Sequence, residues 1–174
     1  MKSSSQKIIE FTIIYNRQKT RLYNYAFKML WDQMLCEDII QNTFMKLFEN
    51  MEKIKNTERI ETWLFTTVRN QIYTMFRNKR VHVDQFKAAD SDKLEIYSEI
   101  NLEDQYEELE IKELVMKELN SMPVEQREVF LLKEYGGFNY KEIAEMMGIS
   151  LELVKSRLHK TREKLIKRMS KIII

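Results

Sequence analysis

The sequence predicts an all-α protein made of two small helical domains, and four observations support this prediction. The 174 residues include three glycines and one proline, which leaves little material for β-hairpins. Hydrophobic residues recur at helical spacing, without the sustained alternation of strands. They make up 44% of the chain, enough for one medium core or two small ones. Charge is gathered in blocks, which favours the division into two domains.

The charge blocks differ in sign along the chain. Residues 1–90 hold fifteen basic and ten acidic residues, and residues 121–174 hold eleven and seven. Between them, residues 91–120 hold three basic and ten acidic residues. Two basic blocks separated by an acidic stretch indicate two modules that face nucleic acid, joined by a segment that avoids the phosphate backbone.

The domain boundaries follow from a loss of periodicity within the acidic stretch. Helical spacing of apolar residues breaks over residues 81–105. We therefore expect a first domain over residues 1–86, an acidic linker over residues 87–112 and a second domain over residues 113–174.

Three helices are expected in the first domain: one within Ile8 to Leu35, one over Asp38 to Met51 and one over Glu61 to Lys79. A polar loop separates the last two. Each helix carries an apolar stripe on one face, at spacings of three and four residues. The stripes consist of Leu22, Ala26, Met29 and Leu30, then Ile40, Phe44, Leu47 and Met51, then Leu64, Phe65, Val68, Ile72 and Met75.

In the second half, helical periodicity resumes near Tyr106. Pro123 suits the start of a helix. Gly136 and Gly137 interrupt the helical pattern before the next helix begins. The expected core residues of this part are Leu119, Met122, Val129, Phe130, Leu132 and Tyr135.

Residues 139–165 contain two amphipathic helical patterns that meet at a chemically specified turn. Asn139 suits the cap of the first helix, and Glu142 is placed to reach back to it, in a variant of the capping box. Gly148 tolerates the left-handed backbone that ends a helix, and Ser150 caps the next one. Ile143, Ala144 and Met147 are expected to face inward. The pattern predicts a helix-turn-helix.

The second helix of this motif has two chemically different sides. Val154, Leu158, Thr161 and Leu165 share the side expected to face the core, and residues 151–174 hold eight basic residues against two acidic ones. The opposite side carries Glu152, Lys155, Ser156, His159 and Lys160, with Arg157 and Arg162 at its flanks. Basic and hydrogen-bonding groups on one side of such a helix predict contact with the major groove of DNA.

Other chemistry has little support in the sequence. His82 and His159 are isolated, and Cys36 has no partner for a disulfide or at metal-ligand spacing, so we expect no metal, no cofactor and no enzymatic activity. A redox role for the single thiol stays open. Glu10 interrupts the apolar run at the N-terminus and no run is long enough to span a bilayer, so we expect a cytoplasmic protein without membrane insertion.

The two halves of the chain together resemble a known family. The segments RLYNYAFKMLWDQMLCEDIIQNTFMKLFENM and TWLFTTVRNQIYTMFRNKR resemble region 2, and LNSMPVEQREVFLLKEYGGFNYKEIAEMMGISLELVKSRLHKTREKL resembles region 4, of the extracytoplasmic-function sigma factors of the sigma-70 family. The resemblance runs from about Thr20 to Arg168. Met122 and Thr161 stand where the family usually has leucine and alanine.

The resemblance implies an alternative sigma factor that binds core RNA polymerase, directs it to specific promoters and nucleates promoter melting. An anti-sigma factor is a further partner that the family admits, although no residue specifies one. In the family, the polymerase-binding surface corresponds to Asp38, Gln41, Asn42 and Met45. The minus-ten element and the displaced single strand would meet Lys55, Asn56, Trp63, Arg69, Asn70, Tyr73, Arg77, Lys79 and Arg80. The minus-thirty-five element would meet Glu152, Lys155, Ser156, Arg157, His159, Lys160 and Arg162.

Alternatives remain open at this point. The polar residues of the second helix are also consistent with an ordinary solvated face. Trp63 is either a core residue beside Leu64 and Phe65 or a wedge that enters opened DNA. The whole chain is also consistent with a helix-turn-helix repressor or activator that binds duplex DNA without being a polymerase subunit. A module that acts only through protein contacts, such as a decoy for another regulator, is a third alternative.

Overall fold

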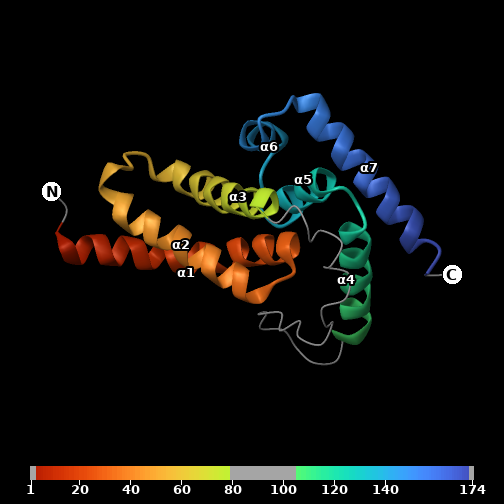
Figure 1. Ribbon diagram of the computed structural model, residues 1–174, viewed down its shortest axis with the longest axis horizontal. Coiled ribbons are helices and arrows are strands. Elements are labelled where there is room, and N and C mark those ends of the chain that lie inside the picture. Colours follow the sequence, from red (N-terminus) through yellow and green to blue (C-terminus); the bar gives the residue numbers. More distant parts are fainter. Residues whose placement is uncertain (1–2, 79–104, 173–174) are drawn as a thin grey trace. The chain divides into compact units, whose positions relative to one another are not determined.

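The computed structural model describes residues 3–78 and 105–172, and every regular element in these two ranges is helical (Figure 1). Side chains are described for residues 3–78 and 110–172. The chain divides into two compact units, Met1–Lys93 and Leu94–Ile174. The prediction of an all-α protein with two helical domains is confirmed.

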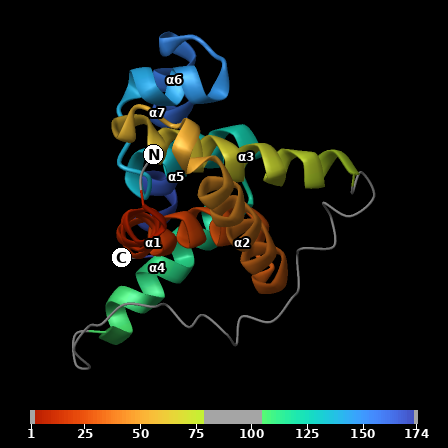
Figure 2. The same ribbon diagram turned by 90° about the vertical axis from the view of Figure 1, so that its left-hand side faces the viewer.

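The first unit consists of three long helices that contact one another pairwise. They are α1 (Ser4–Leu30), α2 (Gln33–Asn50) and α3 (Ile60–Asn78), and both views show them packed together (Figure 2). Two short 3₁₀ helices, η1 (Met51–Lys53) and η2 (Thr57–Arg59), lie between α2 and α3. The predicted apolar stripes supply the core, which includes Leu22, Ala26, Leu47, Leu64, Phe65, Val68 and Ile72. Of the predicted stripe residues, Met51 and Met75 are half-buried rather than buried.

The boundary between α1 and α2 differs from the prediction. The first helix ends at Leu30, within the expected range of Ile8 to Leu35, because Trp31 adopts a left-handed conformation with φ 55°. The second helix begins at Gln33 rather than at Asp38. Asp32 then caps α2, and its side chain accepts a hydrogen bond of 3.0 Å from the backbone N–H of Leu35. Glycine is the usual residue at a left-handed helix end, so a tryptophan there gives no turn signal in the sequence.

The N-terminal half of α1 is held on α2 by an aromatic cluster. The ring of Phe11 packs edge-on against Phe44 and Phe48, with centroids 6.2 and 5.2 Å apart. Tyr15 lies 4.8 Å from Phe44 by the same measure. Lys7 adds a cation–π contact with Phe48 at 4.6 Å. Such contacts add about 0.5–1.5 kcal/mol per aromatic pair to the burial itself, so α1 is anchored along its length.

The second unit is built around its last helix. It contains α4 (Gln105–Asn120), α5 (Val124–Glu134), α6 (Tyr140–Met147) and α7 (Leu151–Met169), and α7 contacts the other three. Pro123 is the residue immediately before α5. The first turns of α4 fall within residues 87–112, which the sequence predicts as linker. The limits that the sequence predicts for the two domains and the linker stay predictions. The buried residues of this unit include Leu119, Met122, Val129, Leu132, Ile143, Val154 and Leu158, whereas Phe130 and Tyr135 are half-buried.

The helix-turn-helix of α6 and α7 has the caps that the sequence predicts. Asn139 and Glu142 form a reciprocal capping box with hydrogen bonds of 2.8 and 2.9 Å. Gly148 is left-handed at φ 65°, and the hydroxyl of Ser150 accepts from the backbone N–H of Leu153. These contacts set both ends of the turn.

Of the three residues of α6 that were expected to face inward, Ile143 alone is fully buried. Met146 is buried beside Ile143, whereas Met147 and Ala144 are half-buried. Spacings of three and four residues both place side chains on one helical face, so periodicity does not choose between Met146 and Met147. Packing of α6 against both α5 and α7 makes that choice.

The surroundings of Gly136 and Gly148 predict different losses of stability when each is replaced by alanine. At Gly136, a Cβ atom would lie 2.5 Å from the carbonyl oxygen of Leu132, so the backbone must move. At Gly148, a Cβ atom meets nothing within 4 Å, and the cost comes from its positive φ alone, about 1–2 kcal/mol. We expect Gly136→Ala to lower the free energy of unfolding more than Gly148→Ala, measured by urea titration with circular dichroism. Both tryptophans, Trp31 and Trp63, lie in the first unit, so their fluorescence transition serves as an internal control and should not shift. An equal or larger loss for Gly148→Ala would contradict this account.

Candidate nucleic-acid interface

The outward side of α7 presents the predicted DNA-facing residues to solvent. Val154, Leu158, Thr161 and Leu165 are all buried, as the sequence predicts. Their burial turns the opposite side of the helix outward. Glu152, Lys155, Ser156, His159, Lys160 and Arg162 are exposed there, and Arg157 is half-buried. The residues predicted to meet the minus-thirty-five element therefore share one accessible surface.

Polar contacts also join α7 to α5 of its own unit. The hydroxyl of Thr161 donates to the carbonyl oxygen of Arg157 at 2.9 Å and lies 3.4 Å from the carbonyl oxygen of Gln126 on α5. Arg162 Nη2 lies 2.8 Å from Glu134 Oε1, also on α5. The hydrogen bond with Glu134 raises the pKa of Arg162 above its ordinary value. A contact with DNA would therefore compete with the fold for Arg162, because its side chain would have to give up the ion pair with Glu134.

His159 has a neighbour on the same surface that is not among the predicted residues. Its Nε2 lies 3.3 Å from Glu163 Oε1, one turn further along α7. Both side chains are well exposed, so the pair adds little stability. It does place a carboxylate at the edge of a basic surface.

On α2, the four predicted polymerase-binding residues form one exposed face. Asp38, Gln41, Asn42 and Met45 are all exposed, and Met45 keeps 54% of its surface accessible. Met34, one turn before Asp38, is 77% exposed and lies on the same side. Met34 was missed in the sequence because it precedes Asp38, where this helix was expected to begin. Exposed methionines are enriched at protein interfaces, which favours a partner over simple solvation.

The predicted aromatic and basic residues of α3 lie along one side of that helix. Trp63 is half-buried, in contrast to its neighbours Leu64 and Phe65, which are fully buried. Tyr73 is also half-buried. The guanidinium of Arg69 lies over the Tyr73 ring at 4.5 Å. An unpaired base that stacks here would therefore meet a Tyr73 ring that already has the planar cation of Arg69 over one face.

Arg77, further along the same strip, is held by its own helix. Its Nη2 donates to the hydroxyl of Thr74 at 3.1 Å, and that hydroxyl donates to the carbonyl oxygen of Asn70 at 2.9 Å. Thr74 thus connects Arg77 with Asn70, although it is not among the predicted residues. The sequence signal that could have identified Thr74 was its helical spacing from Asn70 and Arg77, which both belong to the predicted set.

The segment between α2 and α3 presents the remaining described residues of this set. Lys55 and Asn56 are exposed. The side chain of Asn56 accepts a hydrogen bond of 3.0 Å from the backbone N–H of Glu58 and so caps η2. The predicted DNA-binding residues Lys79 and Arg80 lie outside the described residues.

Within the described residues, no group of three or more His, Cys, Asp or Glu side chains is placed to hold a metal ion. Burial raises the pKa of Cys36 to about 12, so at neutral pH the thiol is protonated and a poor nucleophile. No helix in the described ranges is long and apolar enough to cross a membrane.

Two helical units, one with a basic helix-turn-helix and one with an exposed polar and aromatic surface, define a DNA-binding protein with a second interaction module. The chain matches the models Sigma-70 region 2 over residues 14–81 and Sigma-70, region 4 over residues 112–165. The ECF RNA polymerase sigma factor SigW of Bacillus subtilis is 27% identical over 166 residues, which cover 91% of this chain and 88% of SigW.

Two solved structures share the fold. The sigma factor RpoE of Bartonella quintana, solved in complex with the anti-sigma factor NepR, has a TM-score of 0.70 at 24% identity, with 92% of this chain and 97% of that chain covered. CnrH, in complex with the cytosolic domain of CnrY, has a TM-score of 0.65 at 20% identity, with 92% and 88% covered.

The chain belongs to the extracytoplasmic-function group of the sigma-70 family. It is an RNA polymerase sigma factor that directs promoter-specific transcription initiation, and it is a subunit without enzymatic activity of its own. The alternative of a repressor that acts without polymerase is set aside, because such a protein needs no region 2.

The geometry of α7 generates a first functional prediction. Arg157 is half-buried at the edge of the outward surface, where it could meet either a base or a phosphate. If Arg157 makes a bidentate base contact, we expect Arg157→Ala to weaken binding of duplex DNA that carries the minus-thirty-five element by about 1–3 kcal/mol. If Arg157 contacts phosphate, we expect the variant to reduce the salt dependence of binding. The measurement is a fluorescence titration of holoenzyme at several salt concentrations. If neither quantity changes, Arg157 is not at the interface.

Proposed function

We propose that three separate surfaces divide the work of initiation. The exposed face of α2 binds core polymerase, the strip on α3 with the segment before it engages the minus-ten element, and the outward side of α7 reads the minus-thirty-five element. The observation that carries this proposal is that all of the described polar and basic residues assigned to these roles are exposed or half-buried, and none lies in a core. The aromatic members, Trp63 and Tyr73, are half-buried as well.

The polymerase surface consists of Asp38, Gln41, Asn42 and Met45. A carboxylate, two amides and a thioether at helical spacing give a partner both hydrogen-bonding groups and apolar area. Exposed Met34 extends the same side of α2 by one turn. The buried side of α2 is occupied by the first unit, so a partner would meet this outward face.

Promoter opening requires groups that favour a single strand over a duplex: aromatic faces for unpaired bases and cations for phosphates. Trp63 and Tyr73 supply the first, and Arg69 and Arg77 supply the second. Arg69 is placed over Tyr73 and Arg77 is tied to Thr74, so both cations are partly oriented before DNA arrives. This arrangement supports a role in nucleating strand separation.

On α7, Lys155, Arg157 and Lys160 suit guanine edges or phosphates, and Glu152 suits the amino group of a cytosine. The two relatives of known structure were each solved in complex with a second protein, an anti-sigma factor in the case of RpoE. We propose that this chain is likewise controlled by a protein partner and acts in the cytoplasm with the polymerase.

Reconstitution with core polymerase tests the proposal as a whole. The purified chain should associate with core enzyme at low ionic strength, and the holoenzyme should initiate at defined promoters, which sequencing of the transcripts would reveal. Absence of association, together with unaided occupancy of duplex sites, would overturn it.

The polymerase surface is tested by removing its polar groups. Asp38→Ala with Gln41→Ala should weaken binding to core polymerase in a pull-down, because two exposed hydrogen-bonding side chains are removed while the buried side of α2 is untouched. Lys46→Ala is the matched control, since Lys46 is exposed on the same helix outside the predicted set. Circular dichroism should show unchanged stability for both variants. Unchanged affinity for core enzyme would remove α2 from the interface.

Trp63 is tested with two forms of the same promoter. If its ring stacks in opened DNA, Trp63→Ala should slow open-complex formation on duplex promoter more than on a premelted one. A fluorescent base in the minus-ten element reports opening. Equal impairment on both templates, together with a lower melting temperature, would instead assign Trp63 to packing of the first unit.

A further inference from the structure

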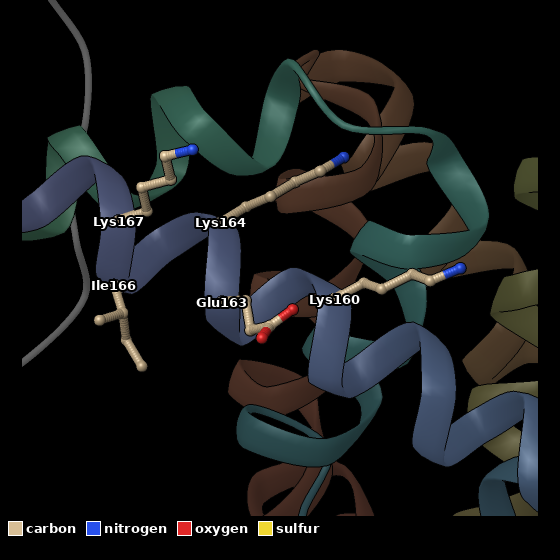
Figure 3. Close-up of a pocket in the computed structure, with 5 residues that line it drawn as sticks. All are labelled: Lys160, Glu163, Lys164, Ile166 and Lys167. Carbon is tan, nitrogen blue, oxygen red and sulfur yellow. The ribbon is translucent and has the colours of Figure 1, made fainter.

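Three lysines follow one line along the C-terminal half of α7. Lys160, Lys164 and Lys167 recur at spacings of four and three residues, and all three are exposed. In Figure 3 their side chains extend to the same side of the helix, whereas Ile166 points away from them. Together with Glu163 and Ile166, they line a shallow hollow. At 1.5 Å per residue, the line spans about 10 Å of helix.

The cations of α7 are used in two ways. Arg162 and Arg168 are bonded to acids of their own unit, Glu134 and Glu118, each at 2.8 Å. No described acidic side chain forms an ion pair with any of the three lysines. Lys164 Nζ instead makes a long contact with a neutral group, Gln126 Oε1, at 3.5 Å. Arg162 and Arg168 thus attach α7 to α5 and α4, whereas the three lysines take no part in the ion pairs among the described residues.

Glu163 is the acid nearest this line in sequence, and it lies in the same hollow. Its Oε1 is 3.3 Å from His159 Nε2. It lowers the net charge of the hollow by one and leaves three cations against one anion.

The line begins within the proposed DNA-reading surface, because Lys160 belongs to both. Lysine binds phosphate as a flexible point charge, unlike the forked guanidinium of arginine. A contact with phosphate carries no base preference. The match to region 4 ends at residue 165, so Lys167 lies beyond it. The last turns of a recognition helix that leaves the groove are well placed for the DNA backbone, as in the homeodomain.

We infer that Lys160, Lys164 and Lys167 form a phosphate-binding line that contacts the backbone of duplex DNA next to the minus-thirty-five element. This inference rests on the proposed function of α7. The competing explanation is local: cations in the last turns of a helix stabilise it through the helix dipole. The two explanations differ in salt dependence, because release of counterions from DNA requires a phosphate contact.

The test uses holoenzyme with the double variant Lys164→Gln and Lys167→Gln, which leaves Lys160 in place. Lys117→Gln is the matched control, since Lys117 is an exposed lysine in the last turn of α4. Affinity is measured across a range of salt concentrations for a promoter duplex identified from the holoenzyme's own transcripts. The same duplex with a scrambled upstream element is the second probe.

We expect the slope of log affinity against log salt to fall by about 0.9 for each phosphate that the variant no longer neutralises. The decrease should be equal on both probes, and Lys117→Gln should behave as wild type. An unchanged slope with a lower melting temperature would assign the lysines to helix stability and overturn the inference. An unchanged slope with weaker binding to core polymerase would assign them to a protein contact and overturn it as well. If wild-type holoenzyme binds the two probes with equal affinity, the DNA-reading role of α7 fails and this inference fails with it.

Discussion

Burial of the inner side of α7 is the constraint on which the DNA-facing surface depends. Val154 and Leu158 are almost completely inaccessible, and burial of each such side chain stabilises the fold by about 1.5–3 kcal/mol. The exposed ion pairs of the same helix contribute about 0–1 kcal/mol each. The apolar stripe therefore decides the rotation of α7, and the pairs with Glu134 and Glu118 only refine it. Because the rotation is fixed, Lys155, Ser156 and Lys160 all point outward.

The first unit follows the same rule with two working helices. α2 and α3 each bury one side against α1, which leaves the polar and methionine face of α2 and the aromatic strip of α3 accessible. Half-burial of Trp63 and Tyr73 suits a surface that offers aromatic faces without exposing a large apolar patch. Contacts within α3, such as Thr74 with Arg77, restrain long side chains before a ligand binds and so reduce the entropic cost of binding.

Several elements were predictable from the sequence because a local chemical signal marked them. The helix-turn-helix carries an asparagine cap at the start of α6, a left-handed glycine at the end of α6 and a serine cap at the start of α7, and all three act as expected. The start of α2 was predicted at Asp38 instead of Gln33, because Trp31 occupies the left-handed position before it without a local signal. That error concealed Met34, which belongs to the exposed side of α2.

Residue spacing and helix caps act within a single helix, and they were enough to establish the helical class, the two-part organisation, the helix-turn-helix and the sides of α3 and α7 that face solvent. Three features required the folded chain: the choice of Met146 over Met147, the pairing of Arg162 with Glu134, and the absence of such a pairing for the described lysines Lys160, Lys164 and Lys167. These depend on which residues from distant parts of the chain meet. Periodicity reports the direction of a side chain and carries no information about the atoms it meets there.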